Sequence, residues 1–447
     1  MNAELLSTQF ANEITNPVII LDELVERLNK TQYIFISTCL DRAYREAEAS
    51  KQRWKAKMPL SSFDGVPIAW KDLFDVAGTI TTAGSATRKD NAPATQDANL
   101  VAKLTQLGMI NIGKTNLSEF AYSGLGLNPA FGTPPNAVNE LHAPGGSSSG
   151  AAVSVAKQIV PFSMGTDTAG SIRIPAAFNG LVGYRPSINR YSQQGVFPLA
   201  SSLDTIGPLA HNVKDCFFLD QLILSQNYDI DFNNKNYADK GNFHLVVDFD
   251  ILDHPDIQDD VTANLTQAVK AFQDAGVKVV FKKINAFHQA LSYIDAGNWL
   301  GAAEAYTLHQ KLLKSDKVKL MDQRVYQRLM KAKDILASTQ IHLYEQARLL
   351  KQRIKNELGN GFLLTPTVAH TAPLLAPLEA DSDLFVKTNS KTLRLTMPGS
   401  FLDMPAITLP NGQGKNGLPT GILISGVNGH DESLLHAAMQ IEDILHA

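Results

Sequence analysis

Two serines with glycine neighbours, Ser147 and Ser171, are the residues of this chain best suited to nucleophilic chemistry. They lie in APGGSSSGAAVSVAKQIVPFSMGTDTAGSIRIP, residues 143–175, in loops at either end of a small-residue helix and an apolar strand. Glycine beside a serine lets backbone amides approach a reacting atom closely, as an oxyanion hole requires. Upstream, Lys71 follows the apolar run 66–70 and is expected at the end of a buried strand. The residues indicate acyl transfer with lysine as the nearest base.

A serine hydroxyl is a weak nucleophile at neutral pH and needs a base within hydrogen-bond reach. A lysine can serve as that base only when its amine is neutral. We expect burial against Ile68, Trp70 and small neighbours to lower the pKa of Lys71, because burial disfavours the charged ammonium form.

The three catalytic segments, in this order and spacing, resemble the amidase signature family of Ser-cisSer-Lys amidohydrolases. The Lys71 segment reads DGVPIAWKDLFDVAG, and the other two are the GGSSSG and DTAGSIRIP loops. The resemblance extends from about Leu21 to the C-terminal helix. It also includes TTAGSAT at 81–87, IGKTNLSEFAYSG at 112–124, GLVGYRPS at 180–187, SSLDTIGPLA at 201–210, LLTPT at 363–367 and FLDMPAITLP at 401–410.

The resemblance implies an α/β chain with the amidase-signature fold: a mixed central β-sheet flanked by helices on both faces, with a helical insertion. It makes Ser171 the nucleophile, Ser147 the bridging serine and Lys71 the base, and it implies that the Gly146–Ser147 peptide is cis. It requires no metal and no organic cofactor.

The resemblance also assigns residues around the reacting carbonyl. The backbone of Ala121 and Tyr122 is expected to line the acyl pocket. The oxyanion hole is expected to consist of the backbone N–H groups of Thr168, Ala169, Gly170 and Ser171.

One position departs from the commonest family spelling. Ala169 stands where glycine is usual, so the loop reads DTAGS. If the backbone there needs a positive φ, alanine lowers the stability of the loop by about 1 kcal/mol, but its N–H remains available as a donor.

Hydrophobic periodicity predicts a single domain over residues 1–447. N-terminal helices are expected in 1–60 and the catalytic signature core in 61–215, where short apolar runs alternate with helical patterns. Residues 286–358 are predicted to form the helical insertion, since neither glycine nor proline occurs from 302 to 357.

The amino-acid composition limits the kinds of partner that we expect for the protein. The chain has 447 residues, 44% of them hydrophobic, and a net charge of −4. This balance gives no whole-chain attraction to nucleic acid or to an anionic membrane. Two cysteines in this length fit a reducing compartment, and the first residues have no basic segment followed by an apolar run, so we expect a cytoplasmic protein. The sequence is compatible with a monomer and with a homodimer.

We therefore expect an amidohydrolase that cleaves a small-molecule amide or urea-like C–N bond through a Ser171 acyl-enzyme. One alternative is the glutamine-hydrolysing A subunit of a tRNA amidotransferase, which belongs to the same family. Another is a Ser-His-Asp esterase, because GSSSG at 146–150 fits the nucleophile-elbow pattern around Ser148, with His370 or His430 as the base.

Overall fold

The backbone is built on one mixed sheet. The computed structural model describes residues 1–224, 230, 232 and 243–447. Within them the sheet has eleven strands in the order β1-β3-β2-β4-β6-β5-β10-β11-β9-β7-β8. The strands are β1 Phe35–Thr38, β2 Pro67–Lys71, β3 Ile110–Thr115, β4 Phe162–Asp167, β5 Val182–Arg185, β6 Thr205–Ala210, β7 His244–Val247, β8 Val279–Phe281, β9 Gly361–Pro366, β10 Ala406–Gln413 and β11 Pro419–Ser425.

The sheet contains two parallel groups joined by antiparallel strands. Strand β2 pairs in parallel with β3 and β4, and β7 pairs in parallel with β8 and β9. All residues of β2, β3 and β4 are buried, as expected of parallel strands covered on both faces. The mixed sheet of the sequence prediction is confirmed.

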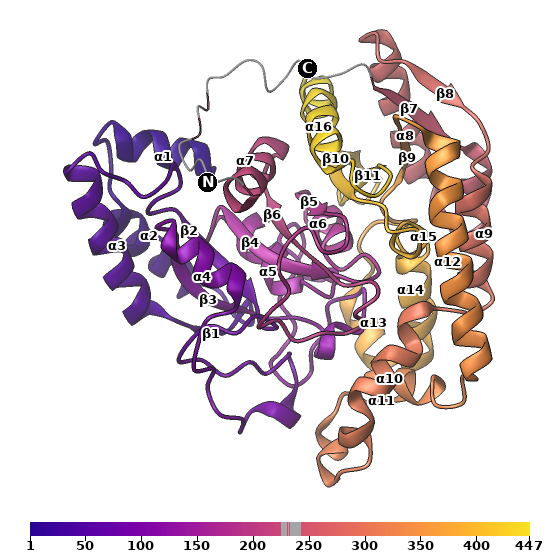
Figure 1. The fold of residues 1–447 in the computed structure, drawn as a ribbon, viewed down its shortest axis with the longest axis horizontal. Helices are drawn as coiled ribbons and strands as arrows, with labels where there is room; N and C mark the ends of the chain where they lie inside the picture. Colours follow the sequence, from indigo (N-terminus) through magenta and orange to yellow (C-terminus); the bar gives the residue numbers. More distant parts are fainter. Residues whose placement is uncertain (225–229, 231, 233–242) are drawn as a thin grey trace.

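Helices cover both faces of the sheet (Figure 1). They are α1 Ala3–Ala11, α2 Pro17–Leu28, α3 Leu40–Lys55, α4 Asn99–Gln106, α5 Ser149–Ala156, α6 Arg173–Phe178, α7 Val213–Leu224, α8 Asp259–Asp274, α9 Asn285–Asp295, α10 Leu300–Leu313, α11 Gln323–Lys331, α12 Ala337–Leu358, α13 Leu375–Ala380, α14 Ser382–Leu393, α15 Met397–Phe401 and α16 Asp431–His446.

The alternation of side chains along β2 explains how the two faces are separated. Ile68 and Trp70 point into a core with apolar residues of α1, α4, α7, α8 and α16. Ala69 points to the opposite face, into a core with residues of α2, α3, α5 and α6. Because successive strand residues alternate, Lys71 lies on the face of Ala69. The expectation that Ile68 and Trp70 bury Lys71 is therefore wrong, since they lie on the other face.

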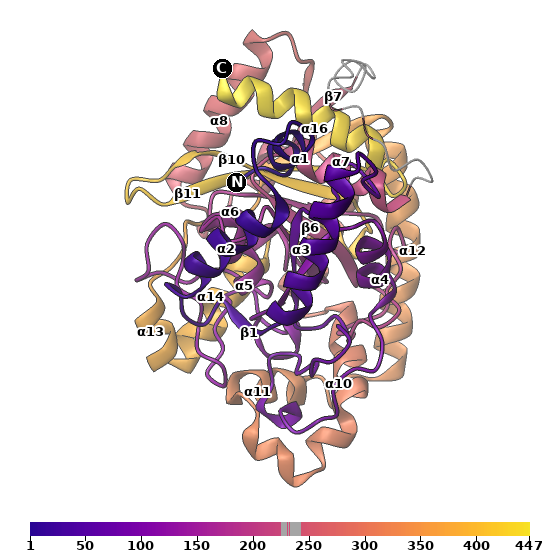
Figure 2. The same cartoon turned by 90° about the vertical axis from the view of Figure 1, so that its left-hand side faces the viewer.

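The segment predicted to be a helical insertion is helical. It contains α9, α10, α11 and α12, and a short 3-10 helix, η5 (Asp316–Leu320), joins α10 to α11. Helices α10 and α11 lie at the same end of the molecule in both views (Figures 1 and 2). Side chains of α11 at this end form part of the wall of a cavity.

The N-terminal region differs in one element from its prediction as helices. Strand β1 lies between α2 and α3 and pairs antiparallel with the edge of β3. It has four residues and none of them is fully buried, so its apolar pattern is too short and too weak to separate it from the neighbouring helices. Every helix in the described ranges is too short or too polar to span a lipid bilayer.

Candidate active site

Lys71 ends strand β2 and is completely buried. Its Nζ lies 2.7 Å from Ser147 Oγ and 2.8 Å from Thr166 Oγ1. Burial lowers the pKa of Lys71 to about 7, because an ammonium group loses its hydration there. The negative charges of Asp167 and Asp204 act in the opposite direction. A substantial fraction of Lys71 is therefore neutral near neutral pH, as a general base requires.

Ser147 lies in the loop before α5, on the same face of the sheet as Lys71. The Gly146–Ser147 peptide is cis, as the family resemblance implies. The carbonyl of Ser147 accepts a hydrogen bond of 3.1 Å from the backbone N–H of Ser118. Ser147 is therefore held by its carbonyl on one side, and its hydroxyl contacts the buried amine on the other.

Ser171 lies between β4 and α6, in the second glycine-containing loop. It is 4% exposed, and its carbonyl accepts a hydrogen bond of 3.1 Å from the N–H of Ser148. Within the described part of the chain, no hydrogen bond joins its hydroxyl to that of Ser147. The structure thus brings Lys71 and Ser147 into direct contact and connects Ser171 to the serine loop through the backbone.

The loop of Ser171 presents several backbone amides. The N–H groups of Thr168, Ala169 and Ser171 have no hydrogen-bond acceptor among the described residues. The N–H of Gly170 donates to Asp167 Oδ1 at 2.8 Å, so an oxyanion formed in this geometry would depend on the other three. Ala169 is not among the residues with positive φ, so alanine at this position brings no backbone strain.

Asp167 organises this loop as a buried charged centre. Its carboxylate contacts Arg173 Nη2 at 2.9 Å and Arg185 Nη1 at 3.2 Å, and all three side chains are fully buried. Burial alone would favour the neutral acid, but the two guanidinium groups hold the pKa of Asp167 well below its ordinary value. Ion pairs with both arginines therefore hold the carboxylate in its charged form.

Two contacts of the site were not predicted from the sequence. Thr166 offers its hydroxyl to Lys71, and Asp204 Oδ1 accepts a hydrogen bond of 2.6 Å from Thr168 Oγ1. Asp204 Oδ2 also accepts the backbone N–H groups of Leu199 and Ala200. Both residues occur in segments that the sequence already singled out, GTDTAGS and SSLDTIGPLA, but their roles depend on contacts across the fold.

A cavity of about 790 Å³ lies between the turn at 118–123, the helical insertion and α14. Tyr122 lines this cavity and Ala121 does not. The lining of the cavity does not include Lys71, Ser147 or Ser171. Residues that form hydrogen bonds with the two serine loops do line the cavity or lie next to a lining residue. Ser118 lines the cavity and donates to Ser147, while Thr396, which precedes the lining residue Met397, donates to the carbonyl of Ala169 at 2.6 Å.

The esterase alternative has no supporting geometry. Ser148 is fully buried, and its hydroxyl donates to the carbonyl of Thr166 at 3.3 Å. The ring of His370 is engaged elsewhere, with Nδ1 2.8 Å from the carbonyl of Thr371 and Nε2 3.0 Å from Thr392 Oγ1. The Ser148 hydroxyl thus joins the serine loop to the end of β4.

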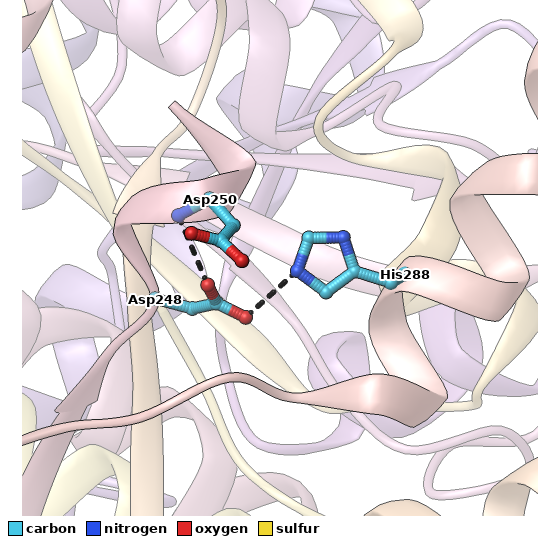
Figure 3. Close-up of side chains that lie close together, drawn as sticks. All are labelled: Asp248, Asp250 and His288. Carbon is cyan, nitrogen blue, oxygen red and sulfur yellow. Dashed lines mark hydrogen bonds and ion pairs between the residues drawn. The ribbon is translucent and has the colours of Figure 1, made fainter. Parts of the chain in front are cut away.

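A separate cluster of Asp248, Asp250 and His288 brings three possible metal ligands within 4.8 Å of one another (Figure 3). Asp248 is already bonded: Oδ2 lies 2.9 Å from His288 Nε2 and accepts the N–H of Ile284 at 2.7 Å. The ammonium of Lys283 lies 2.8 Å from Asp250 Oδ2 and supplies a positive charge where a cation would bind. We therefore interpret this cluster as support for the connection into α9.

The fold and the arrangement of lysine and serines define an amidase-type α/β protein, and known proteins agree. A solved amidase structure superimposes with a TM-score of 0.87 at 27% identity, covering 99% of both chains. Allophanate hydrolase of Kluyveromyces lactis gives a TM-score of 0.82 at 26% identity, over 97% of this chain and 71% of that one. The family model Amidase matches residues 20–435, so the chain belongs to the amidase family.

Among curated relatives, the A subunit of the glutamyl-tRNA(Gln) amidotransferase of Protochlamydia amoebophila (strain UWE25) is 28% identical over 443 residues. That alignment covers 92% of this chain and 88% of the relative. The similarity therefore extends over nearly the whole of both chains.

Proposed function

We propose that the protein is an amidohydrolase that cleaves a small-molecule amide through a Ser171 acyl-enzyme. The observation that carries the proposal is the buried Lys71 amine, with its pKa lowered to about 7, at 2.7 Å from Ser147 Oγ. A neutral lysine beside a bridging serine is a base that needs no histidine.

In the proposed cycle, Lys71 takes a proton from Ser147 while Ser147 takes one from Ser171, whose Oγ attacks the amide carbonyl carbon. The backbone N–H groups of Thr168, Ala169 and Ser171 stabilise the resulting oxyanion. The proton returns through Ser147 to the leaving nitrogen, the C–N bond breaks, and an ester to Ser171 remains. Water then enters and loses a proton through the same relay as its oxygen attacks the ester carbonyl carbon. The bond to Ser171 Oγ breaks, that oxygen regains a proton through Ser147, and the acid is released.

An acylating fluorophosphonate probe tests this assignment. We expect it to label Ser171, as located by mass spectrometry of the modified peptide, because that hydroxyl is the attacking group. Ser171→Ala should abolish labelling. Ser149→Ala is the matched control and should be labelled like the wild-type protein, since the Ser149 hydroxyl has no hydrogen-bond partner among the described residues. A label on Ser148 would contradict the proposal.

The cavity favours an amide that also carries an acidic group. Its lining contains six Lys or Arg side chains and three Asp side chains. Asp322, Asp256 and Asp295 each pair with one cation of the lining. The remaining cations have no ion-pair partner among the described residues, and these are Arg328, Lys331 and Lys387. A negatively charged substrate would complement this unbalanced charge.

We therefore expect lower KM values for succinic acid mono-4-nitroanilide than for the neutral 4-nitroacetanilide. The double variant Lys331→Met, Lys387→Met should raise KM for the charged anilide about tenfold, equivalent to about 1.4 kcal/mol of binding free energy, and leave KM for the neutral one nearly unchanged. Salt should reduce the difference by screening. Equal KM values for both anilides in the wild-type enzyme would exclude an anionic preference.

The alternative function is that of a glutamine-hydrolysing component of a larger enzyme, favoured by the name of the curated relative of 28% identity. Glutamine also bears a carboxylate, so the charge of the cavity does not separate the two functions. Purification of this chain alone does: we expect turnover of the anilides without a partner. Activity that appears only with co-purified partner proteins and glutamine would favour the alternative.

A further inference from the structure

Glu119 is a buried carboxylate that the proposed reaction does not use. It begins the 3-10 turn η2 (Glu119–Ala121), which follows β3, and it is 2% exposed. Its Oε1 accepts a hydrogen bond of 2.6 Å from Ser85 Oγ, and its Oε2 accepts one of 2.7 Å from the backbone N–H of Asp322. One side chain thus joins the turn, the loop 81–87 and the start of α11.

The turn that carries Glu119 contacts the catalytic loop at one end and the cavity at the other. Ser118 donates its N–H to the carbonyl of Ser147. At the other end, Arg328 Nη1 donates to the carbonyl of Tyr122 at 2.9 Å, and the guanidinium lies 4.3 Å from the centre of the Tyr122 ring. Any displacement of this turn would therefore affect both the catalytic loop and the cavity wall.

Helix α11 forms one wall of the cavity. Asp322, which caps this helix with its side chain, and Arg324, Val325 and Arg328 all line the cavity. The N-terminus of α11 is held to the turn by Glu119, and its later residues are held by the contact of Arg328 with Tyr122. The position of this wall relative to the catalytic loop thus depends on a hydrogen bond to a buried carboxylate.

Retaining a carboxylate here carries a physical penalty. Burial raises the pKa of Glu119 to about 7, because a charged carboxylate is poorly solvated at this position. An apolar side chain would remove that penalty but would leave the Asp322 N–H without its acceptor, and an unpaired buried donor is costly.

We propose that Glu119 is a positioning residue that holds α11 against the turn 118–122 and so sets the substrate cavity. The inference rests on the proposed amidohydrolase function. It states that Glu119 acts on substrate binding through Asp322 and Tyr122, without contact with the reacting atoms.

The test compares Glu119→Ala with Glu119→Gln. Glutamine keeps an oxygen to accept the Asp322 N–H, and its NH₂ can donate to Ser85 Oγ, whose own proton can go to Thr87 Oγ1 at 2.7 Å. We expect Glu119→Ala to raise KM for succinic acid mono-4-nitroanilide at least tenfold with kcat within threefold. Glu119→Gln should restore KM to within threefold of the wild-type value.

Glu442→Ala is the matched control. Glu442 is also a buried carboxylate whose pKa burial raises to about 7. It accepts the N–H of Val213, which lies in the core of Ile68 and Trp70, on the face of the sheet opposite Lys71. This variant should lose thermal stability but keep KM within twofold. Hydrogen–deuterium exchange of residues 323–331 should increase at least tenfold in Glu119→Ala and stay unchanged in Glu442→Ala.

Unchanged KM in Glu119→Ala, equal effects of the alanine and glutamine variants, or unchanged exchange in α11 would each overturn the inference. Failure of the proposed function gives a different result, because the wild-type enzyme would then lack fluorophosphonate labelling of Ser171. In that case the exchange of α11 still shows whether Glu119 holds the helix, and unchanged exchange overturns the inference by itself.

Discussion

Replacing Lys71 by methionine is expected to lower kcat/KM by about 10²–10⁴-fold, the range typical for loss of a general base. Methionine keeps the apolar stem of the side chain and removes the amine that lies 2.7 Å from Ser147 Oγ. The variant should remain folded, because methionine has a similar shape and places no new charge in the core. Turnover of a 4-nitroanilide, with a urea unfolding curve as the control for folding, measures both effects.

The pH profile gives a second signature of the same base. The ammonium form of Lys71 cannot accept a proton, and its pKa is about 7, so activity should rise as pH increases through about 7. Asp204→Asn should shift this rise in activity to lower pH, since the charge of Asp204 raises the pKa of Lys71. A flat profile between about pH 6 and 8.5, or a Lys71→Met variant with most of its activity, would contradict this assignment.

Much of the fold and the contact between Lys71 and Ser147 could be predicted because they depend on local pattern. An apolar run followed by a lysine predicts a buried strand end, and the serine loops flank a recognisable helix and strand. Strand β2, Pro67–Lys71, lies within one residue of the predicted apolar run 66–70 at each end.

The supporting residues could not be predicted in the same way, since their roles come from contacts between distant segments. Asp204 reaches Thr168 across 36 positions, and Glu119 reaches Asp322 across 203. No periodicity in the chain connects such pairs. The partner of the Gly170 N–H was equally hidden, because the sequence does not show that the side chain of Asp167 turns back onto its own loop.

Replacing Asp167 should strongly reduce the stability of the protein. Asparagine at this position is expected to lower the free energy of unfolding by about 3–5 kcal/mol, because it leaves the buried cations Arg173 and Arg185 without their counter-ion. The pKa of Asp167 is held below its ordinary value, so the ionised carboxylate stabilises the fold at neutral pH. This stabilisation is lost only as the pH falls below the pKa of a free carboxyl group. Urea unfolding at pH 7 measures the loss.

Asp64→Asn is the matched control for this prediction. Asp64 is fully buried and bonds to Arg53 at 2.6 Å, but the arginine side chain is 26% exposed and can recover hydration when its partner is removed. The control should therefore cost less than Asp167→Asn. Asp167→Asn should also lower the pKa of Lys71 and shift the rising limb of the pH profile to lower pH, since its charge favours the ammonium form. Equal losses of unfolding free energy in the two variants would show that burial of Arg173 and Arg185 does not increase the cost of removing their counter-ion. A pH–activity profile that does not shift in Asp167→Asn would show that the charge of Asp167 does not affect the pKa of Lys71.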